Sequence, residues 1–345
     1  MCGIAGIVSL RSGLEPPASE RLTAMVAALA HRGPDEFGVY RDAHAGLGSA
    51  RLSIVDVAGG SQPLSNEDGT LWIAFNGEIV NYVELRLELE DLGHRFRTQS
   101  DTEVIVHAYE AWGDNAFRRF NGQWSVAIWN SRERSLVLAR DPFGITPLYL
   151  CEHAGRLYFA SEVKAIFAAS SEIPRQFDPV GLQETFTFWS TVPPQGIFRG
   201  VSELEPGRVR VYARGTVREH VCWEPRYPTR GEGEFPGTLE DAADAVAAAL
   251  EKATRLRILR ADVPVGSYLS GGLDSSLLAS LALGAKGERF STFSLRFEDA
   301  EYDETPFQRL MARHLGSDHR EVVVSRRDIA DVFPAVIEHA ERFGL

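Results

Sequence analysis

Cysteine is scarce in this 345-residue chain, which contains only Cys2, Cys151 and Cys222. An odd and widely spaced set of three excludes a disulfide framework, and no two cysteines have the Cys-x-x-Cys spacing of a zinc site. We therefore expect a reduced, cytoplasmic protein.

Positively charged residues are also few. The chain has 36 lysines and arginines and 48 aspartates and glutamates, which gives a formal net charge of −12. A nucleic-acid partner needs clustered basic residues for its phosphates, so none is expected. A membrane partner is not expected either, because no apolar run approaches the roughly 20 residues of a spanning helix. The start of the chain also lacks the basic region of a signal peptide. ATP is not excluded, because a local loop can hold it whatever the overall charge.

The length indicates two domains, and the first part of the chain is rich in short apolar runs typical of strands. These runs are Cys2–Val8, Leu71–Phe75, Trp124–Trp129, Ser135–Ala139, Leu148–Cys151 and Leu157–Ala160. Tyr82–Leu92 and Thr102–Trp112 instead carry apolar residues at spacings of three and four, which predicts helices. Strands around a few helices favour a layered α+β domain.

The segment Trp223–Gly237 is rich in proline, glycine and charge, which predicts a linker. A helix start follows, where Thr238 and Asp241 form a pair resembling a capping box. Strands and helices then alternate as Val263–Leu269, Leu277–Leu283, Phe290–Phe297, Thr305–Leu315, Arg320–Ser325 and Arg327–Arg342. This order is typical of a parallel sheet with crossover helices, of which three strands make only a part. We expect domains at 2–222 and 238–345, the second incomplete.

Cys2 is the first candidate for chemistry. Removal of Met1 would leave a thiol and a free α-amino group on one residue, and the ordinary pKa of that amine is roughly 7.7–8.0. The amine could then act as the base that produces the nucleophilic thiolate. An isolated cysteine is more often a small buried residue, but the second position and the Gly3–Gly6 sequence after it favour catalysis.

Seven short segments of the chain, taken in order, match motifs of known enzymes. They are Met1–Ile7, His31–Asp35, Arg51–Ile54, Asn76–Ile79, Ser100–Glu103, Arg140–Gly144 and Ser270–Ser276. The first six resemble the glutamine amidotransferases that have an N-terminal nucleophile, and the last is similar to the pyrophosphate loop of asparagine synthetases. Each segment alone is modest evidence, but their shared order makes chance a poor explanation. The resemblance, which extends to at least Glu304, implies an αββα sandwich of the N-terminal-nucleophile hydrolase type. A partial α/β domain with a parallel sheet and the pyrophosphate loop would follow it.

The resemblance also implies a glutamine site with Cys2 as nucleophile. The Asn76 side chain and the Gly77 N–H would form the oxyanion hole, and Arg51 would pair with the α-carboxylate of glutamine. Asp101 would pair with its ammonium. The glutamine-binding set is Arg51, Leu52, Ser53, Ile54, Asn76, Gly77, Glu78 and Asp101.

Each of these residues also has an ordinary structural interpretation. Asn76-Gly77 alone predicts a hairpin turn, and a lone arginine or aspartate is usually a solvated surface charge. His31–Asp35 could form a turn or act directly in catalysis. Arg140 and Asp141 are expected to organise the fold or the face between the domains.

A second site is predicted at Ser270–Ser276, which lies between an apolar strand and a helix, the usual context of a phosphate-binding loop. Its two glycines let backbone N–H groups approach an anion, its three serines add hydroxyl donors, and its aspartate would act through Mg²⁺. A Gly-Ser turn that opens a helix is the alternative. By resemblance, Leu269 and Leu295 would lie along the adenine or ribose of ATP. The alternative, that both are ordinary core residues of strands, is equally well supported. The expected ATP residues are Leu269, Ser270, Gly271, Gly272, Asp274, Ser275, Ser276 and Leu295.

By resemblance, the chain would be a glutamine-dependent asparagine synthetase with glutamine, aspartate and ATP as substrates and Mg²⁺ as a cofactor. Ammonia released at Cys2 would reach a second site, where ATP converts aspartate to aspartyl-AMP. Full members of the family continue well beyond residue 345, so a homodimer, or a partner chain that supplies the rest, stays open. Two other readings also stay open: an amidotransferase acting on another carboxylate, and a truncated relative that is only a glutaminase or a regulatory protein.

Overall fold

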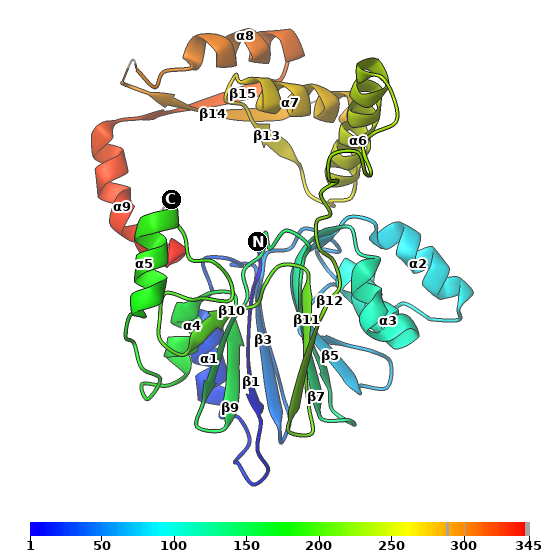
Figure 1. Cartoon of the computed structure of the whole chain (residues 1–345), viewed down its shortest axis with the longest axis vertical. Helices are drawn as coiled ribbons and strands as arrows, with labels where there is room; N and C mark the ends of the chain where they lie inside the picture. The colour runs from blue at the N-terminus through cyan, green and yellow to red at the C-terminus, as the bar shows by residue number, and fades with distance from the viewer. Residues whose placement is uncertain (288–289, 300, 342–345) are drawn as a thin grey trace. The chain divides into compact units, whose positions relative to one another are not determined.

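The computed structural model describes residues 1–287, 290–299 and 301–341. These residues form two compact units, built mainly from Met1–Pro225 and from Arg226–His339 (Figure 1). Residues 223–237, the predicted linker, contain neither helix nor strand. Among the helices of the described residues, none combines the length and apolarity required to cross a membrane.

The first unit contains two six-stranded sheets, and all neighbouring strands in both are antiparallel. The first sheet has the order β10 (Val201–Glu203), β8 (Tyr149–His153), β9 (Arg156–Ala160), β1 (Gly3–Ser9), β3 (Ala45–Arg51) and β2 (Glu36–Arg41). The second has the order β12 (Thr216–Val221), β11 (Arg208–Ala213), β7 (Ser135–Arg140), β6 (Gly122–Asn130), β5 (Leu71–Ile79) and β4 (Leu64–Ser65). The helices of this unit are α1 (Ser19–Ala27), α2 (Tyr82–Asp91), α3 (Asp101–Trp112), α4 (Val163–Ala169), α5 (Pro179–Phe188) and the 3₁₀ helix η1 (Gly113–Arg118).

Alternation along β1 shows how the layers form. Ile4 and Val8 belong to a core cluster shared by the two sheets, whereas Ala5 and Ile7 pack with residues of α1 and α4. Because neighbouring residues of a strand point to opposite faces, a strand that is apolar at every position must be covered on both sides. The first sheet therefore lies between a helical layer and the second sheet.

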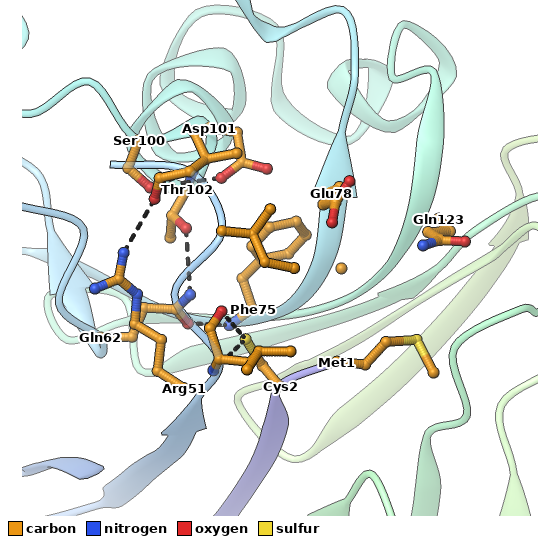
Figure 2. A pocket seen from close by; sticks show the side chains of 14 residues that line it. Met1, Cys2, Arg51, Gln62, Phe75, Glu78, Ser100, Asp101, Thr102 and Gln123 are labelled. Carbon is orange, nitrogen blue, oxygen red and sulfur yellow. Dashed lines mark hydrogen bonds between the residues drawn. The ribbon is translucent and has the colours of Figure 1, made fainter. Parts of the chain in front are cut away.

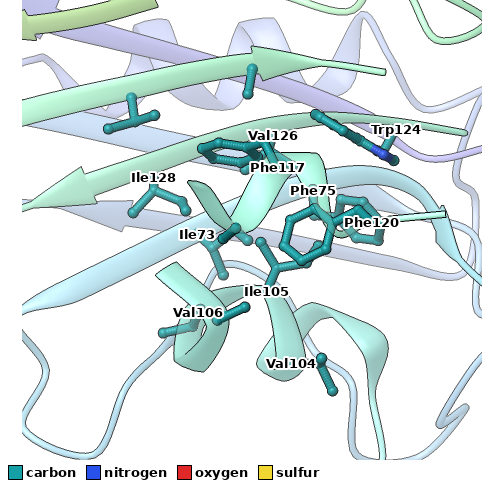
Figure 3. Close-up of a cluster of buried hydrophobic side chains, with 14 of the residues drawn as sticks. Ile73, Phe75, Val104, Ile105, Val106, Phe117, Phe120, Trp124, Val126 and Ile128 are labelled. Atoms are coloured by element: carbon teal, nitrogen blue, oxygen red, sulfur yellow. The ribbon is translucent and has the colours of Figure 1, made fainter. Parts of the chain in front are cut away.

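The second sheet divides in the same way. Val126 and Ile128 of β6 pack with the residues of α3 that are drawn in Figure 3, while Ala127 and Trp129 belong to the cluster between the sheets. Helix, sheet, sheet and helix thus form four layers. The αββα sandwich predicted for this part of the chain is confirmed.

Several elements of this unit were not predicted from the sequence, and β3 shows why. Its sequence AGLGSAR lacks β-branched and aromatic residues, which are the usual signals of a strand. A Cβ on Gly46 would lie 2.3 Å from Leu22 Cδ1, and a Cβ on Gly48 would lie 2.4 Å from Val26 Cγ2. Gly46 and Gly48 are therefore required because α1 packs directly on this face of the strand.

The second unit contains a parallel sheet in the order β13 (Gly266–Tyr268), β14 (Ser291–Phe297) and β15 (Asp318–Val324). Its helices are α6 (Leu239–Leu259), α7 (Leu273–Lys286), α8 (Thr305–Leu315) and α9 (Arg326–Ala340). The predicted parallel sheet with crossover helices is confirmed, as is the capping box of Thr238 and Asp241.

Two elements of this unit differ most from the prediction, and the ends of several others shift by one or two residues. Helix α7 begins at Leu273, four residues before the predicted start at Leu277. The prediction missed the first turn because that turn is mostly polar and carries no apolar periodicity. Strand β13 covers only three of the seven predicted residues. The predicted end of the last helix, Arg342, lies outside the described residues, and α9 ends at Ala340.

Candidate active site

A pocket in the first unit collects most of the residues predicted to bind glutamine (Figure 2). The pocket is lined by the two residues just before β1, by the C-terminal half of β5 and by the first turn of α3, because these termini meet at one edge of the two sheets. Ser53 and Asn76 are not among the lining residues, although both of their chain neighbours are. The lining residues are Met1, Cys2, Arg51, Leu52, Ile54, Val55, Gln62, Phe75, Gly77, Glu78, Ser100, Asp101, Thr102 and Gln123.

The Cys2 side chain lies just before β1 and is 8% exposed. Its Sγ accepts a hydrogen bond from the Leu52 N–H at 3.3 Å. Burial raises the pKa of the Cys2 thiol, and the contact with the Leu52 backbone partly offsets that rise. Burial also lowers the pKa of the nearby Met1 α-amino group, so the chain terminus at this pocket holds its proton less tightly than a solvated amine.

The His31–Asp35 segment holds two walls of the pocket in place. Arg32 donates from Nε to the Cys2 carbonyl oxygen at 2.9 Å and from Nη1 to Glu162 at 2.8 Å. Asp35 accepts the Ser53 N–H at 2.8 Å. Neither Arg32 nor Asp35 lines the pocket, so these contacts position Cys2 and the loop that follows β3.

Asn76 and Gly77 lie inside β5 and pair with Ser125 and Trp124 of β6. The hairpin turn that Asn-Gly alone predicts is therefore wrong. Gly77 has a φ of +147°, and a Cβ there would lie 2.0 Å from the Gln123 carbonyl oxygen, so no other residue fits. The Asn76 side chain is fully buried, and neither its Nδ2 nor its Oδ1 has a hydrogen-bond partner within the described residues.

Asp101 opens helix α3 and is 4% exposed. Its Oδ2 accepts the Ile79 N–H at 3.0 Å, and Ser100 caps the helix by accepting the Thr102 N–H. Burial raises the pKa of Asp101 to about 7, the Ile79 N–H opposes that rise, and the negative charge of Glu78 adds to it. A cation bound between the two carboxylates would favour the charged form of Asp101.

Arg51 lies at the end of β3 and is 4% exposed. It pairs with Glu36 of β2 at 3.1 Å. It also donates to the carbonyl oxygens of Val55, Asp56 and Val57 at 3.0, 2.7 and 3.4 Å. Arg51 therefore fixes the loop that forms one wall of the pocket.

Gln62 was not predicted from the sequence. It is 6% exposed, and its Oε1 accepts the Phe75 N–H at 2.8 Å while its Nε2 donates to Thr102 Oγ1 at 3.3 Å. Gln62 thereby ties β5 to α3 at the floor of the pocket. Its two partners lie 13 and 40 residues away in the chain, so no local pattern could have indicated this role.

Arg140 and Asp141 organise the turn that follows β7. Arg140 pairs with Glu203 at 2.9 Å and donates to the carbonyl oxygen of Thr146 at 2.8 Å. Asp141 is fully buried and accepts the N–H groups of Phe143 at 2.9 Å and Thr146 at 3.1 Å. Both residues are thus used by the fold.

The Ser270–Ser276 loop of the second unit joins β13 to α7. Gly271 has a φ of +85°, and a Cβ there would lie 2.7 Å from the Gln308 N, so this position requires glycine. Helix α7 has Gly272 as its N-cap and no side-chain cap, which leaves its first N–H groups free to bind an anion. Ser270 and Ser275 share a hydrogen bond at 2.8 Å.

The remaining predicted ATP residues have different environments. Asp274 is exposed in the first turn of α7, and Ser276 is half-buried behind it. Leu269 is 1% exposed and belongs to the apolar core of the unit, while Leu295 of β14 is 51% exposed. Of the two leucines, only Leu295 has surface available to a ligand.

Comparison with known proteins adds family information to both units. A family described as a glutamine amidotransferase domain matches residues 1–223, and a family described as asparagine synthase matches residues 245–345. Asparagine synthetase [glutamine-hydrolyzing] 1 of Bacillus subtilis (strain 168) is 36% identical over 342 residues, which are 98% of this chain and 52% of the relative. Asparagine synthetase [glutamine-hydrolyzing] 3 of Arabidopsis thaliana is 34% identical over 357 residues, which are 100% of this chain and 54% of the relative.

The chain thus spans about half the length of the curated relatives that it matches. Among solved structures, a glutamine phosphoribosylpyrophosphate amidotransferase from B. subtilis overlaps 93% of this chain and 81% of its own. Its identity is 17% and its TM-score is 0.47, a distant likeness that adds nothing to the fold described above.

Proposed function

The chain belongs to the glutamine amidotransferase family, and from this premise we propose that it releases ammonia from glutamine at Cys2. We further propose that the ammonia serves the ATP-dependent conversion of aspartate to asparagine, because the relatives with the same two segments are named glutamine-hydrolysing asparagine synthetases. In this proposal, residues 2–222 form the glutaminase domain, 223–237 the linker and 238–345 part of the synthase domain. A cytoplasmic setting suits the three free cysteines.

The observation that carries the proposal is a pocket that brings Cys2 together with the side chains of Arg51, Glu78 and Asp101. Once Met1 is removed, Cys2 would carry both the thiol and the α-amino group. The amine accepts the thiol proton, Sγ forms a bond with the side-chain amide carbon, and the same proton then leaves with the departing ammonia. Water hydrolyses the resulting thioester and releases glutamate.

The oxyanion formed during attack needs donors that are already in place. Asn76 supports this role because its amide is buried without a partner among the described residues. Leaving a buried amide unsatisfied costs about 1–3 kcal/mol, so the side chain gains most when a substrate oxygen arrives. Gly77 supports the role too, because a backbone without Cβ allows close approach.

Recognition of the amino-acid end of glutamine is proposed for Asp101, Glu78 and Arg51. The two carboxylates suit an ammonium, and the guanidinium suits a carboxylate. The loop that contains Leu52, Ser53 and Ile54 would complete the site. Its Leu52 N–H donates to Cys2 Sγ, and its Ser53 N–H donates to Asp35.

For the second unit, we propose that Ser270–Ser276 holds the pyrophosphate part of ATP. The uncapped start of α7 and the glycine-only conformation at Gly271 fit a phosphate group. Asp274, exposed at the same helix start, would hold Mg²⁺, which neutralises phosphate charge. Leu295 would lie along the base or ribose, whereas Leu269 fits the strand-core alternative better because it is buried.

The experiment that tests the glutaminase proposal compares Cys2→Ala with Cys151→Ala. Both cysteines are buried in the first sheet region, but only Cys2 lines the pocket. Cys2→Ala should abolish glutamate release and labelling by a diazo-ketone analogue of glutamine, and Cys151→Ala should retain both. Glutamate release that persists in Cys2→Ala would overturn the assignment. Assay of asparagine, AMP and pyrophosphate with all three substrates present tests the synthase half separately.

A further inference from the structure

His94, in the segment after α2, lies close to His107 and Glu110 of α3. His107 and Glu110 are three residues apart on α3 and so share one face of the helix. The distance from His107 Nδ1 to Glu110 Oε2 is 2.9 Å, and that from His94 Nδ1 to His107 Nδ1 is 3.2 Å. His94 Nδ1 lies 3.8 Å from Glu110 Oε2. None of the three lines the glutamine pocket.

Protons alone satisfy this cluster poorly. His107 Nδ1 has two close neighbours, His94 Nδ1 and Glu110 Oε2, but can carry only one proton to share between them. If His107 is an imidazolium, its second proton on Nε2 points toward Glu103 Oε1 at 3.7 Å, which is longer than a hydrogen bond. Nε2 accordingly has no hydrogen-bond partner within the described residues, although His107 is fully buried.

A metal ion satisfies the same three atoms well. Bonds of about 2.0–2.1 Å in a tetrahedral zinc site place neighbouring ligand atoms about 3.3 Å apart. The three observed separations, 2.9, 3.2 and 3.8 Å, lie on both sides of that value. We propose that His94, His107 and Glu110 bind one divalent transition-metal ion of the zinc class, with water as the fourth ligand.

The surroundings of the three ligand atoms support this site. Glu110 Oε1 accepts a hydrogen bond from Asn66 Nδ2 at 2.8 Å, which leaves Oε2 facing the histidines. Glu103 Oε1 lies 3.7 Å from the far nitrogen of His107, which is beyond hydrogen-bond length, so Glu103 adds negative charge beside the ring without bonding to it. Asn66 and Glu103 are themselves 4% and 1% exposed, so both are fixed by the fold.

Negative charge also lies on the far side of the His107 ring. Glu67 Oε1 is 4.0 Å from His107 Nε2, and Glu103 Oε1 is 3.7 Å from the same atom. Two carboxylates this close to the ring favour a cation bound to it.

The test measures zinc binding by the whole chain with Cys2→Ala as background, so that the pocket thiol cannot bind the ion. Isothermal titration with Zn²⁺ should give one site per chain, and Co²⁺ should give the visible absorption of a tetrahedral complex. His94→Asn and Glu110→Gln should each weaken binding by at least about ten-fold. His153→Asn is the matched control, because His153 is also a half-buried histidine of the first unit and lies on β8.

Glu110→Gln keeps its size and can still accept from Asn66, so it guards against a failure to fold in the histidine variant. Tryptophan fluorescence without metal reports whether each variant is folded. Equal Zn²⁺ affinity in His94→Asn, Glu110→Gln and the control would mean an adventitious ion only and would overturn the proposal, as would an absence of binding to the parent. The readout is binding, so the result is independent of glutamine hydrolysis.

Discussion

Asp101 should destabilise the empty protein at neutral and alkaline pH. Its carboxyl group is 4% exposed at the start of α3 and has a pKa of about 7, against an ordinary value of 3.8. Asp101→Asn replaces this carboxyl with a neutral amide of the same shape. The amide oxygen can still accept the Ile79 N–H that now bonds to Oδ2, so the change mainly removes an ionisable group.

The size of the effect follows from the two pKa values. Between pH 3.8 and pH 7 the native state binds more protons at Asp101 than the unfolded state does, so the free energy of unfolding falls as the pH rises. At about 1.4 kcal/mol per unit, the total loss is on the order of 4 kcal/mol by pH 7 and is constant above it. From pH 5 to pH 8, Asp101→Asn should gain about 3 kcal/mol relative to the wild type.

The assay is urea unfolding followed by tryptophan fluorescence. All six tryptophans lie between Trp72 and Trp223, so the signal reports the first unit alone. Glutaminase activity is measured in parallel at pH 8, where loss of the charge proposed to pair with the substrate ammonium should raise the KM for glutamine by about 10- to 100-fold. The stabilised variant should thus be the impaired one.

Asp91→Asn is the control, because Asp91 is exposed at the end of α2 and such substitutions usually change stability by less than about 0.5 kcal/mol. Equal stability of the wild type and Asp101→Asn at pH 8, or a difference that does not grow between pH 5 and pH 8, would refute the reasoning. Either result would mean that the empty pocket solvates this carboxylate.

Three further substitutions test the rest of the two sites. Gly77→Ala should lower the free energy of unfolding by on the order of 1–3 kcal/mol and remove most of the glutaminase activity, because the new Cβ would meet the Gln123 carbonyl oxygen. Urea unfolding and glutamate release measure the two effects, and a stable, active variant would contradict the prediction. Arg32→Gln should lower kcat about 10- to 100-fold with little change in KM, because the Cys2 carbonyl oxygen loses its bond to Arg32. Steady-state kinetics measure both constants, and an effect on KM alone would argue that Arg32 does not position Cys2. Asp274→Asn should weaken ATP binding in the presence of Mg²⁺ about 10-fold or more, as measured by titration calorimetry, and unchanged affinity would count against the loop assignment.

The motifs predicted that residues far apart in the chain lie close together in the structure. Cys2, Arg51, Gly77 and Asp101 are at least 24 residues apart in every pairing, yet the pocket brings all four together. Resemblance could give this result because the order of the motifs carries information on tertiary structure that spacing alone lacks. Chemistry of single residues would have left Asn76 in a turn.

Strands were predictable where their apolar side chains are large. They were missed where close packing allows only small residues. Strands β5, β6 and β7 are rich in branched or aromatic residues and were found. Strand β3 was missed because its sequence has no branched or aromatic residue except one leucine, and α1 leaves no room for a side chain at Gly46 or Gly48. In the second unit, alternation predicted the parallel order correctly, whereas the polar first turn of α7 hid the start of that helix.

Arg51 shows what neither resemblance nor composition could predict. Its guanidinium already holds three backbone carbonyl oxygens and pairs with Glu36, whose side chain is 35% exposed. A buried guanidinium without a carboxylate would be costly, so Glu36 balances its charge while no substrate is present. A substrate carboxylate that replaces Glu36 would exchange one ion pair for another and leave the three carbonyl contacts intact. Arg51 can therefore shape the pocket and bind glutamine without being left unpaired in either state.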